Sequence, residues 1–330
     1  MKREIRYREP AKCIAAWNAN ADVRRKSASG GIAHALAETC MSRGGAFAGT
    51  RYDQSLKPIV AIARDKRELE AYKGSRYVQS VMGAEVLKEI EHILKTGQQV
   101  TFVGTPCQIA ALYATLEQDY QNLLTVDLLC HGTCPTSYFT EELEHLRKEY
   151  RIEFDDVRFR DNKGHAFHLT LWNKGQLVKD IPGYCEYYYA GFLYGISMRE
   201  ICYSCKFARR ERIADITLGD FIGLGSLSPF EHDKTNVSAV LLNTEKGLKA
   251  WNELLEHNPE IKWEERSYEE RLTYQYSVLK PFPKDPRREK FLILYPKYGF
   301  VRSIRKVLWP KLWRSRFWQF FRDLKSKRTK

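Results

Sequence analysis

Residues 99–132 read QVTFVGTPCQIAALYATLEQDYQNLLTVDLLCHG, and this stretch decides the fold class. Val100–Gly104 is a short run of apolar and β-branched residues, and a helical pattern of apolar residues begins just after it. A second apolar run covers Leu123–Leu129, and a helix-length segment follows Pro135. Two such units in succession are typical of neighbouring parallel strands in an α/β sheet.

A cysteine follows each of these runs. Cys107 lies in the turn after the first run, and Cys130 ends the second. If the two strands are parallel neighbours, both cysteines leave the sheet at the same edge. Open α/β sheets bind ligands there, because loops and helix N-termini offer free backbone N–H groups. The sequence therefore predicts a binding site at this edge.

A further cysteine pair, Cys202 and Cys205, has the C-x-x-C spacing that lets both sulfurs bind one metal or cluster. With Cys107 and Cys130 it provides four thiolates, the number that an iron–sulfur cube or a tetrahedral zinc requires. The remaining cysteines are interpreted as small buried hydrophobic residues. They are Cys13, Cys40, Cys134 and Cys185.

Two polar stretches are candidates for binding a phosphorylated ligand. Ser27–Gly31, with the sequence SASGG, precedes a helical pattern, so it is either a phosphate cradle or an N-cap with a tight turn. Residues 72–79, YKGSRYVQ, carry two cations and two aromatic rings. Such a set can hold a planar ring and its phosphates, or it can be a solvated turn.

Beyond residue 150 the pattern changes from β–α alternation to short strands, which predicts a small antiparallel insertion near residues 157–181. We therefore expect an α/β fold with a mixed sheet, flanking helices, this insertion and a basic helical C-terminal tail. The expected domains are an N-terminal segment 1–26, a main domain 27–279 and a tail 280–330.

The net charge of +13 is segregated in the tail. Residues 280–330 contain 17 Lys and Arg against 3 Asp and Glu, whereas residues 1–279 contain 37 against 38. A neutral body with one basic end argues against a nucleic-acid groove across the fold. Nucleic acid is therefore the least favoured partner.

The sequence favours a reducing, cytoplasmic location. The N-terminus MKREIRYREP has no apolar region of the kind that secretory signals contain. Eight cysteines in 330 residues are too few for a disulfide scaffold, and no run reaches the roughly 18 apolar residues of a membrane span. In that compartment the thiols remain available for metal.

The tail combines aromatic residues with cations. Residues 301–325 include eight Lys and Arg, and we expect a helix break at Pro310. A pair of interfacial helices on the anionic inner face of a membrane has this composition. A helical hairpin packed on the body or on a second copy is the alternative.

Six blocks in order resemble the coenzyme F420 hydrogenase/dehydrogenase beta-subunit family, and the resemblance runs from about Cys13 to Tyr298. They are SASGG, KGSRYVQS, VGTPCQIAAL, LLTVDLLCHG, CYSCKF and ADITLGDF. Members of this family are iron–sulfur flavoproteins that pass electrons between clusters, FAD and a soluble redox partner or substrate. Relatives include chlorophyll-pathway reductases, and many members of unknown substrate are encoded near bacterial surface-polysaccharide genes. The resemblance implies an oxidoreductase.

The resemblance also implies roles for individual residues. Cys107, Cys130, Cys202 and Cys205 would bind one 4Fe–4S cluster. His131, next to a cysteine ligand, is the candidate catalytic residue that delivers a proton, or it forms a hydrogen bond to a cluster sulfur or a backbone carbonyl. The FAD site would include Ser27, Ser29, Gly30, Gly31, Lys73, Gly74, Ser75, Arg76, Gln79, Thr105, Gln108 and Asp220.

One departure from the family affects the expected partners. Many relatives begin with a ferredoxin module bearing C-x-x-C-x-x-C runs, and only Cys13 precedes the first matching block here. We therefore expect one cluster, a separate ferredoxin-like electron donor and an unknown small-molecule substrate; the alternative is a truncated relative whose chemistry has drifted. The rival hypothesis is a non-enzymatic binding protein in which the same four cysteines close a structural zinc site.

Overall fold

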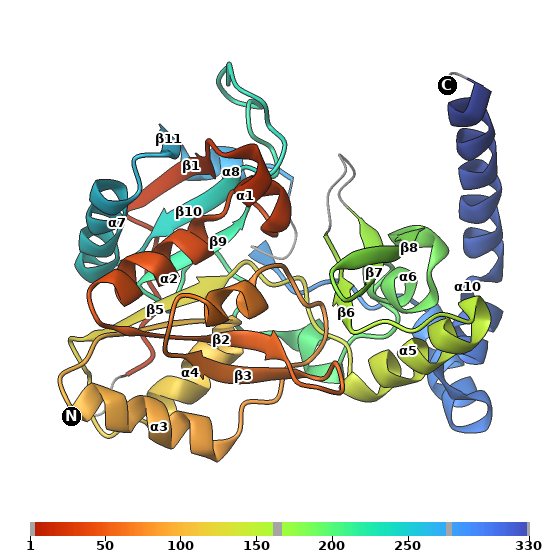
Figure 1. Ribbon diagram of the computed structural model, residues 1–330, viewed down its shortest axis with the longest axis horizontal. Coiled ribbons are helices and arrows are strands. Elements are labelled where there is room, and N and C mark those ends of the chain that lie inside the picture. Colours follow the sequence, from red (N-terminus) through yellow and green to blue (C-terminus); the bar gives the residue numbers. More distant parts are fainter. Residues whose placement is uncertain (1–3, 161–166, 275–278, 329–330) are drawn as a thin grey trace.

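The computed structural model describes residues 4–160, 167–274 and 279–328. It contains a large lobe built on one sheet and a smaller lobe that carries a second sheet and the C-terminal helix (Figure 1). The expected α/β class, the small antiparallel insertion and the helical tail are all confirmed.

The main sheet is mixed, and its parallel part lies in the middle. Strands β2, β4, β5 and β9 are parallel neighbours, and β1 runs in the same direction because it is antiparallel to β10, which is antiparallel to β9. The carboxyl ends of these five strands therefore meet at one edge, called here the carboxyl edge. In spatial order the strands are β11 (Ile261–Arg266), β1 (Lys12–Asn18), β10 (Ser238–Leu242), β9 (Ile216–Asp220), β5 (Leu123–Leu128), β4 (Val100–Gly104), β2 (Ala46–Tyr52) and β3 (Pro58–Ala63).

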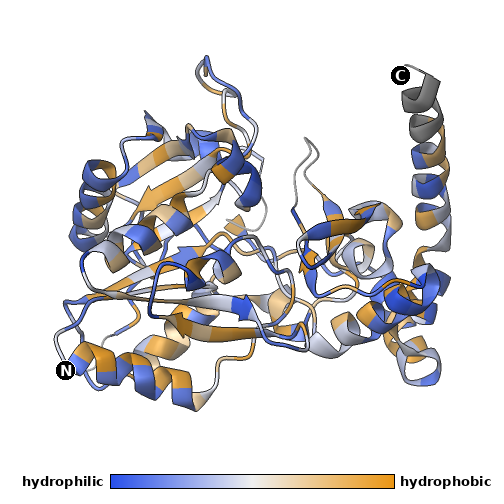
Figure 2. Ribbon diagram, viewed as in Figure 1, coloured by the Kyte–Doolittle hydropathy of each residue, from blue (hydrophilic) through white to orange (hydrophobic). Residues whose placement is uncertain are grey.

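Helices cover both faces of the main sheet, which explains why its central strands are apolar on both sides. On β5, Leu123 packs on the side of α3 and α4, whereas Leu124 packs on the side of α2 and α7. Figure 2 shows hydrophobic strands inside and alternating hydrophilic and hydrophobic residues along these helices. The helices of this lobe are α1 (Ala21–Lys26), α2 (Ile32–Ser42), η1 (Glu68–Tyr72), α3 (Ala84–Lys95), α4 (Pro106–Thr115), α7 (Glu245–His257) and α8 (Tyr268–Leu272).

The smaller lobe is organised around an antiparallel sheet and a core rich in aromatic residues. Phe139, Phe159, Tyr188 and Tyr189 are fully buried there and contact one another. Its elements are α5 (Thr136–Tyr150), β6 (Asp156–Arg158), β7 (His168–Asn173), β8 (Gln176–Pro182), η2 (Gly183–Cys185), α6 (Tyr187–Leu193), η3 (Glu200–Ser204) and α10 (Arg287–Arg328).

The C-terminal tail differs from its prediction in one respect. The expected break at Pro310 is wrong, because α10 is helical on both sides of this residue, which is exposed. The interruption lies instead at Gly299, whose φ of 71° is non-helical. The Glu141 carboxylate accepts hydrogen bonds from the Phe300 N–H at 2.6 Å and from the Tyr295 hydroxyl at 2.9 Å, so α5 holds this kink.

The expected segments take part in both lobes. The N-terminal segment 1–26 supplies β1 to the main sheet, and the tail 280–330 supplies α10 to the smaller lobe. The domain boundaries themselves stay a prediction. No helix in the described part of the chain combines the length and the apolar run that crossing a bilayer would need.

Candidate functional site

Cys107 is fixed by the turn that joins β4 to α4. The Gln108 side chain accepts the Thr105 N–H at 2.9 Å, which holds the first turn of α4 in place. The Thr105 hydroxyl lies 3.1 Å from the Cys107 sulfur. This sulfur belongs to an exposed residue at the carboxyl edge. Thr105 and Gln108, both predicted in the flavin site, therefore also orient a cysteine.

The four predicted metal ligands lie together in the fold. Burial, together with smaller contributions from the neighbouring Cys107, Cys202 and Cys205 sulfurs, raises the pKa of the Cys130 thiol to about 12. Burial likewise raises the pKa of Cys205, with contributions from Cys107 and Cys202. Thiols that disfavour one another's ionisation need a cation to become thiolates together. Their surroundings therefore suit a metal centre.

Backbone N–H groups also point at these sulfurs. The Cys130 sulfur accepts from the N–H of Gly132, and the Cys205 sulfur accepts from those of Phe207 and Ala208. Hydrogen bonds of this kind stabilise negative charge on sulfur and tune the potential of an iron–sulfur centre. These N–H groups belong to the same loops as the cysteines, so the local backbone conformation is enough to direct the N–H groups at the sulfurs.

Gly132 lets the Cys130 loop approach the C-x-x-C segment. Its φ is +129°, which side chains rarely adopt, and a Cβ there would lie 2.5 Å from the Met198 sulfur and 3.5 Å from the Cys202 Cβ. A residue with a side chain would have to displace the Met198 sulfur and adopt this strained backbone conformation. The CHG sequence after β5 therefore has a steric role besides providing a ligand.

A mononuclear metal site would require the sulfurs to lie close together around one point. Around a tetrahedral zinc with Zn–S bonds of about 2.3 Å, the sulfurs lie about 3.8 Å apart. In the described ranges, no three His, Cys, Asp or Glu side chains converge closely enough to hold one metal ion. The four cysteines therefore influence one another's ionisation without forming a ready-made mononuclear site, and their role as metal ligands stays a prediction.

The other cysteines are all buried, as their interpretation as hydrophobic residues requires. Cys134 is the cysteine most easily mistaken for a metal ligand, because it follows Cys130 by only four residues. Its sulfur lies 3.2 Å from the Ser197 hydroxyl in the core of the smaller lobe. The other three are Cys13, Cys40 and Cys185.

Arg212 joins the two cysteine-bearing segments, a role that no sequence pattern indicates. Its guanidinium pairs with the Asp127 carboxylate at 3.1 Å, and both side chains are almost completely buried. It also donates to the carbonyls of Leu128 at 3.4 Å and Phe207 at 3.3 Å. Leu128 precedes Cys130 and Phe207 follows Cys205. Arg212 is therefore a positioning residue between the two halves of the site.

We expect Arg212→Met to destabilise the protein by about 3–5 kcal/mol, because it leaves the Asp127 carboxylate buried without its partner. Iron content should fall with it, since the two cysteine segments lose their common anchor. Urea unfolding and iron per chain are the measurements. The neighbouring Arg210→Met is the control, because Arg210 forms exposed pairs that contribute under about 1 kcal/mol. Equal behaviour of the two variants would contradict the role of Arg212.

The predicted phosphate cradle lies at the same edge of the sheet. The Gly30 N–H donates to the Ser238 hydroxyl at 2.8 Å, and a Cβ at Gly30 would lie 2.3 Å from the Ala16 carbonyl oxygen. The Ser27 hydroxyl is occupied, because it donates to the Val23 carbonyl. Ser238 starts β10 and Ala16 is near the end of β1, so the turn rests on the carboxyl edge.

The start of α2 is open to an anion. Gly31, the N-cap residue of α2, has a φ of +88°. As a glycine it has no side chain that could accept hydrogen bonds from the backbone N–H groups of the first turn. The Ser29 hydroxyl is buried and has no hydrogen-bond partner among the described residues. Free N–H groups beside an unpaired hydroxyl fit a phosphate.

The polar loop after η1 lies beside this cradle. Burial raises the pKa of Glu70, but Lys73 and, less strongly, Lys26 outweigh it and hold the pKa below its usual value. Glu70 therefore lies near both lysines. Because Lys26 immediately precedes the cradle, Lys73 also lies near the cradle. The Lys73 ammonium is 2.5 Å from the Glu70 carboxylate, and Gly74 is open to solvent space.

Arg76 supports its own loop. Its guanidinium donates to the carbonyls of Ala71 at 2.5 Å and Lys73 at 3.3 Å, and it stacks over the Tyr52 ring at 4.7 Å. Ser75 forms a hydrogen bond with Tyr77. These contacts shape the loop and leave Arg76 little freedom to reach a ligand.

The loop continues toward the cysteines. The Gln79 N–H donates to the Cys134 carbonyl at 2.9 Å, and Gln108 donates to the Ser80 hydroxyl at 2.8 Å. The loop that contains Gln79 and Ser80 is therefore bonded both to the segment after Cys130 and to the turn that carries Cys107.

Asp220 lies between the two lobes. It ends β9 and pairs with Arg160 of the smaller lobe, whose side chain is buried and also contacts Tyr77. Tyr77 stacks on Phe192 at 4.9 Å between ring centroids. Arg160 and Phe192 were not predicted, because each reaches the site through contacts distant in sequence.

His131 occupies an apolar niche. Its ring lies 4.2 Å from that of Phe282 and 5.1 Å from that of Phe192, and its Nε2 has no hydrogen-bond partner among the described residues. Burial lowers the pKa of His131 to about 4. The two phenylalanine rings and the burial together make the surroundings of this imidazole apolar. Its catalytic role stays a prediction.

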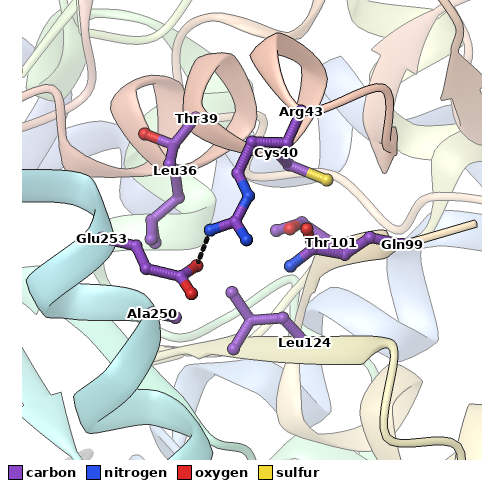
Figure 3. A pocket seen from close by; sticks show the side chains of 9 residues that line it. All are labelled: Leu36, Thr39, Cys40, Arg43, Gln99, Thr101, Leu124, Ala250 and Glu253. Carbon is purple, nitrogen blue, oxygen red and sulfur yellow. Dashed lines mark ion pairs between the residues drawn. The ribbon is translucent and has the colours of Figure 1, made fainter. Parts of the chain in front are cut away.

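A small cavity lies far from these residues (Figure 3). It is lined by Thr101 and Leu124, at the amino ends of β4 and β5, and by the Arg43–Glu253 ion pair at 2.6 Å. Its volume of about 10 Å³ leaves room for about one water. It lies at the edge opposite the four predicted metal ligands and is not a candidate site.

Comparisons with known proteins agree with this geometry. The family described as the C-terminal part of the beta chain of coenzyme F420 hydrogenase/dehydrogenase matches residues 97–265, and the corresponding N-terminal family matches residues 13–88. The first range contains the four cysteines and the second contains the cradle. No curated protein matches the chain.

Solved structures with a similar fold include a chain from a xenon derivative of the F420-reducing NiFe hydrogenase complex of Methanosarcina barkeri, with 17% identity and a TM-score of 0.53. The alignment covers 94% of this chain and 92% of that chain. At this identity the likeness concerns the fold alone.

Proposed function

The chain belongs to the coenzyme F420 hydrogenase/dehydrogenase beta-subunit family of oxidoreductases, and from this premise we propose that it is an iron–sulfur flavoprotein. The observation that carries the proposal is that Cys107, Cys130, Cys202 and Cys205 lie near enough to one another to disfavour one another's ionisation. When bound there, a 4Fe–4S cluster and FAD supply the exchange of single electrons and electron pairs.

The residues around the cysteines would control the potential of this centre. The N–H groups of Gly132, Phe207 and Ala208 donate to two of the sulfurs and stabilise their negative charge. Phe192 and Phe282 enclose His131 beside Cys130 and keep water from that side. A low local dielectric strengthens each of these electrostatic contributions.

The cradle and the adjoining loop would bind FAD. The free N–H groups at the start of α2 and the Ser29 hydroxyl would bind its phosphates, with Lys73 nearby as a cation. Thr105, Gln108 and Asp220 lie along the path toward Cys107, where the ring would be held near the cluster ligands.

The proposed partners are a ferredoxin-like protein as electron donor and a small molecule as acceptor. The similar solved chain is part of a hydrogenase complex, which supports electron exchange with a protein partner. We propose a cytoplasmic enzyme whose pathway is surface-polysaccharide biosynthesis.

Anaerobic purification of the full chain tests the proposal. We expect a brown protein with a broad absorbance band near ~400 nm, about four irons and four sulfides per chain and one FAD released on denaturation. The rival zinc protein would be colourless and would contain one zinc without iron. That result would overturn the proposed function.

A further inference from the structure

The end of α10 has no role in the proposed function, and it lies outside both ranges of the family match. Figure 1 shows it rising alone beside the smaller lobe. The helix packs on the body as far as Leu312, through buried residues that include Ile304 and Leu308. A later contact is made by Arg316, whose guanidinium donates to the Cys185 carbonyl at 3.0 Å.

An aromatic row follows the opposite side of this helix. Trp309, Trp313, Phe317 and Phe321 are spaced by four residues and, with Phe320, fall within an arc of about 120° at 3.6 residues per turn. Ring centroids of Trp313 and Phe317 are 5.3 Å apart, and those of Phe317 and Phe321 are 4.7 Å apart.

These rings are exposed to an unusual degree. Together with Trp318, their side chains are between 42% and 59% exposed. Leu308 and Leu312, by contrast, are buried on the other side of the same helix. Contiguous exposed rings of this kind mark an interaction surface, because single exposed apolar residues need no explanation whereas a continuous row does.

Exposed cations flank the row. No acidic residue occurs between Glu289 and Asp323. The Arg305 guanidinium lies 5.6 Å from the centroid of the Trp309 ring, so the cation and the ring are exposed on the same part of the helix surface. The exposed cations of this stretch, apart from Arg316 with its bond to the body, are Arg302, Arg305, Lys306, Lys311 and Arg314.

We propose that residues 309–321 bind an anionic lipid surface, with the aromatic row inserted at the headgroup level and the cations on the lipid phosphates. Tryptophan-rich rows flanked by Lys and Arg suit this interface, because the rings are apolar with a polar tip and the cations meet the negative surface potential. Pairing with a second copy is disfavoured, since it would bring two acid-free cationic helices together.

Co-sedimentation of the full-length protein with lipid vesicles tests this proposal. We expect strong binding to vesicles of phosphatidylcholine with phosphatidylglycerol and weak binding to phosphatidylcholine alone. High salt should weaken the binding without removing it, because ring insertion is not screened.

Two variants separate the contribution of the aromatic rings to vesicle binding from that of the cations. Trp313→Ser/Phe317→Ser/Phe321→Ser should lower the partition coefficient at least tenfold, because it removes the inserted rings while retaining every buried residue and all the cations. Arg305→Gln/Arg314→Gln should weaken binding only to the anionic vesicles. The matched control, Leu227→Ser/Trp263→Ser, removes exposed apolar side chains from the other lobe and should bind like the unaltered protein.

Several outcomes would overturn the proposal. The triple serine variant binding vesicles like the unaltered protein, or melting at a clearly lower temperature, would make the row a packing element. A concentration-dependent dimer that the triple variant loses would identify a second copy as the occupant. Binding to duplex DNA without binding to anionic vesicles would assign the helix to nucleic acid.

Discussion

Cys130→Ser is expected to remove nearly all bound iron, from about four irons per chain to under one, and to bleach the ~400 nm band. Serine is a poor ligand for this centre, and an iron without its thiolate is open to oxidation. Cys107→Ser, Cys202→Ser and Cys205→Ser should behave alike, because each of the four cysteines is a ligand of the proposed cluster and they lie near one another. Iron, sulfide and absorbance on anaerobically purified protein are the measurements.

Cys134→Ala is the sharpest control for this experiment. Cys134 lies four residues from Cys130 and close to the site, yet its sulfur is sealed in the core beside the Ser197 hydroxyl. Iron content should stay as in the unaltered protein, with some loss of stability from a lost buried contact. Cys40→Ala and Cys185→Ala extend the control to more distant positions. Equal iron loss in ligand and control variants would refute the assignment.

The sequence was most informative where the structure is determined locally. Val100–Gly104 is a strand with the expected bounds, and Leu123–Leu128 is its parallel neighbour. Both runs are apolar and short, and each is followed by a turn and a helix, so the pattern and the connection rules agree. The position of Cys107 and Cys130 at one edge follows directly from this.

Long-range pairing was beyond the sequence pattern. The apolar residues of Lys12–Asn18 form only a short island in a polar stretch, yet this segment is strand β1 in the main sheet. Its neighbours in the sheet are β10 (Ser238–Leu242) and β11 (Ile261–Arg266), which lie over 200 residues away in the sequence. No local sequence pattern predicts a pairing between segments so far apart.

The same limit explains the residues that were missed at the site. In the run Arg209-Arg210-Glu211-Arg212 every charge reads as a solvated surface. Arg212 alone is buried, because the strand β5 brings Asp127 against it. Only the tertiary structure separates this arginine from Arg210, which forms exposed pairs.

The tail has an inner part that packs on the smaller lobe and an outer part that extends beyond it. The sequence pattern does not distinguish the two parts. The inner part is a packing element, since Phe300, Ile304 and Leu308 are fully buried in the core of the smaller lobe. Truncation after Tyr298 would remove these residues and is therefore expected to unfold that lobe. Any deletion that tests the outer part has to begin after Arg316.

The flavin cradle calls for a substitution that adds charge without disrupting the fold. Gly30 is unsuitable, because a Cβ there would lie 2.3 Å from the Ala16 carbonyl oxygen and any side chain would displace backbone. Gly31 has room, because a Cβ added there would meet no atom nearer than 3.5 Å. Its positive φ of +88° is tolerated best by Asn and Asp among residues with side chains.

We expect Gly31→Asp to weaken FAD binding by roughly 1–3 kcal/mol, which is about one to two orders of magnitude in affinity, because a carboxylate would compete with a phosphate for the N–H groups at the start of α2. Gly31→Asn has nearly the same shape and backbone strain but no charge, so it should retain most of the flavin. FAD per chain and flavin fluorescence on titration are the measurements, with urea unfolding to show that both variants fold alike. If the two variants bound FAD equally well, charge at this turn would be irrelevant to the flavin, and the phosphates would have to be sought elsewhere along the carboxyl edge.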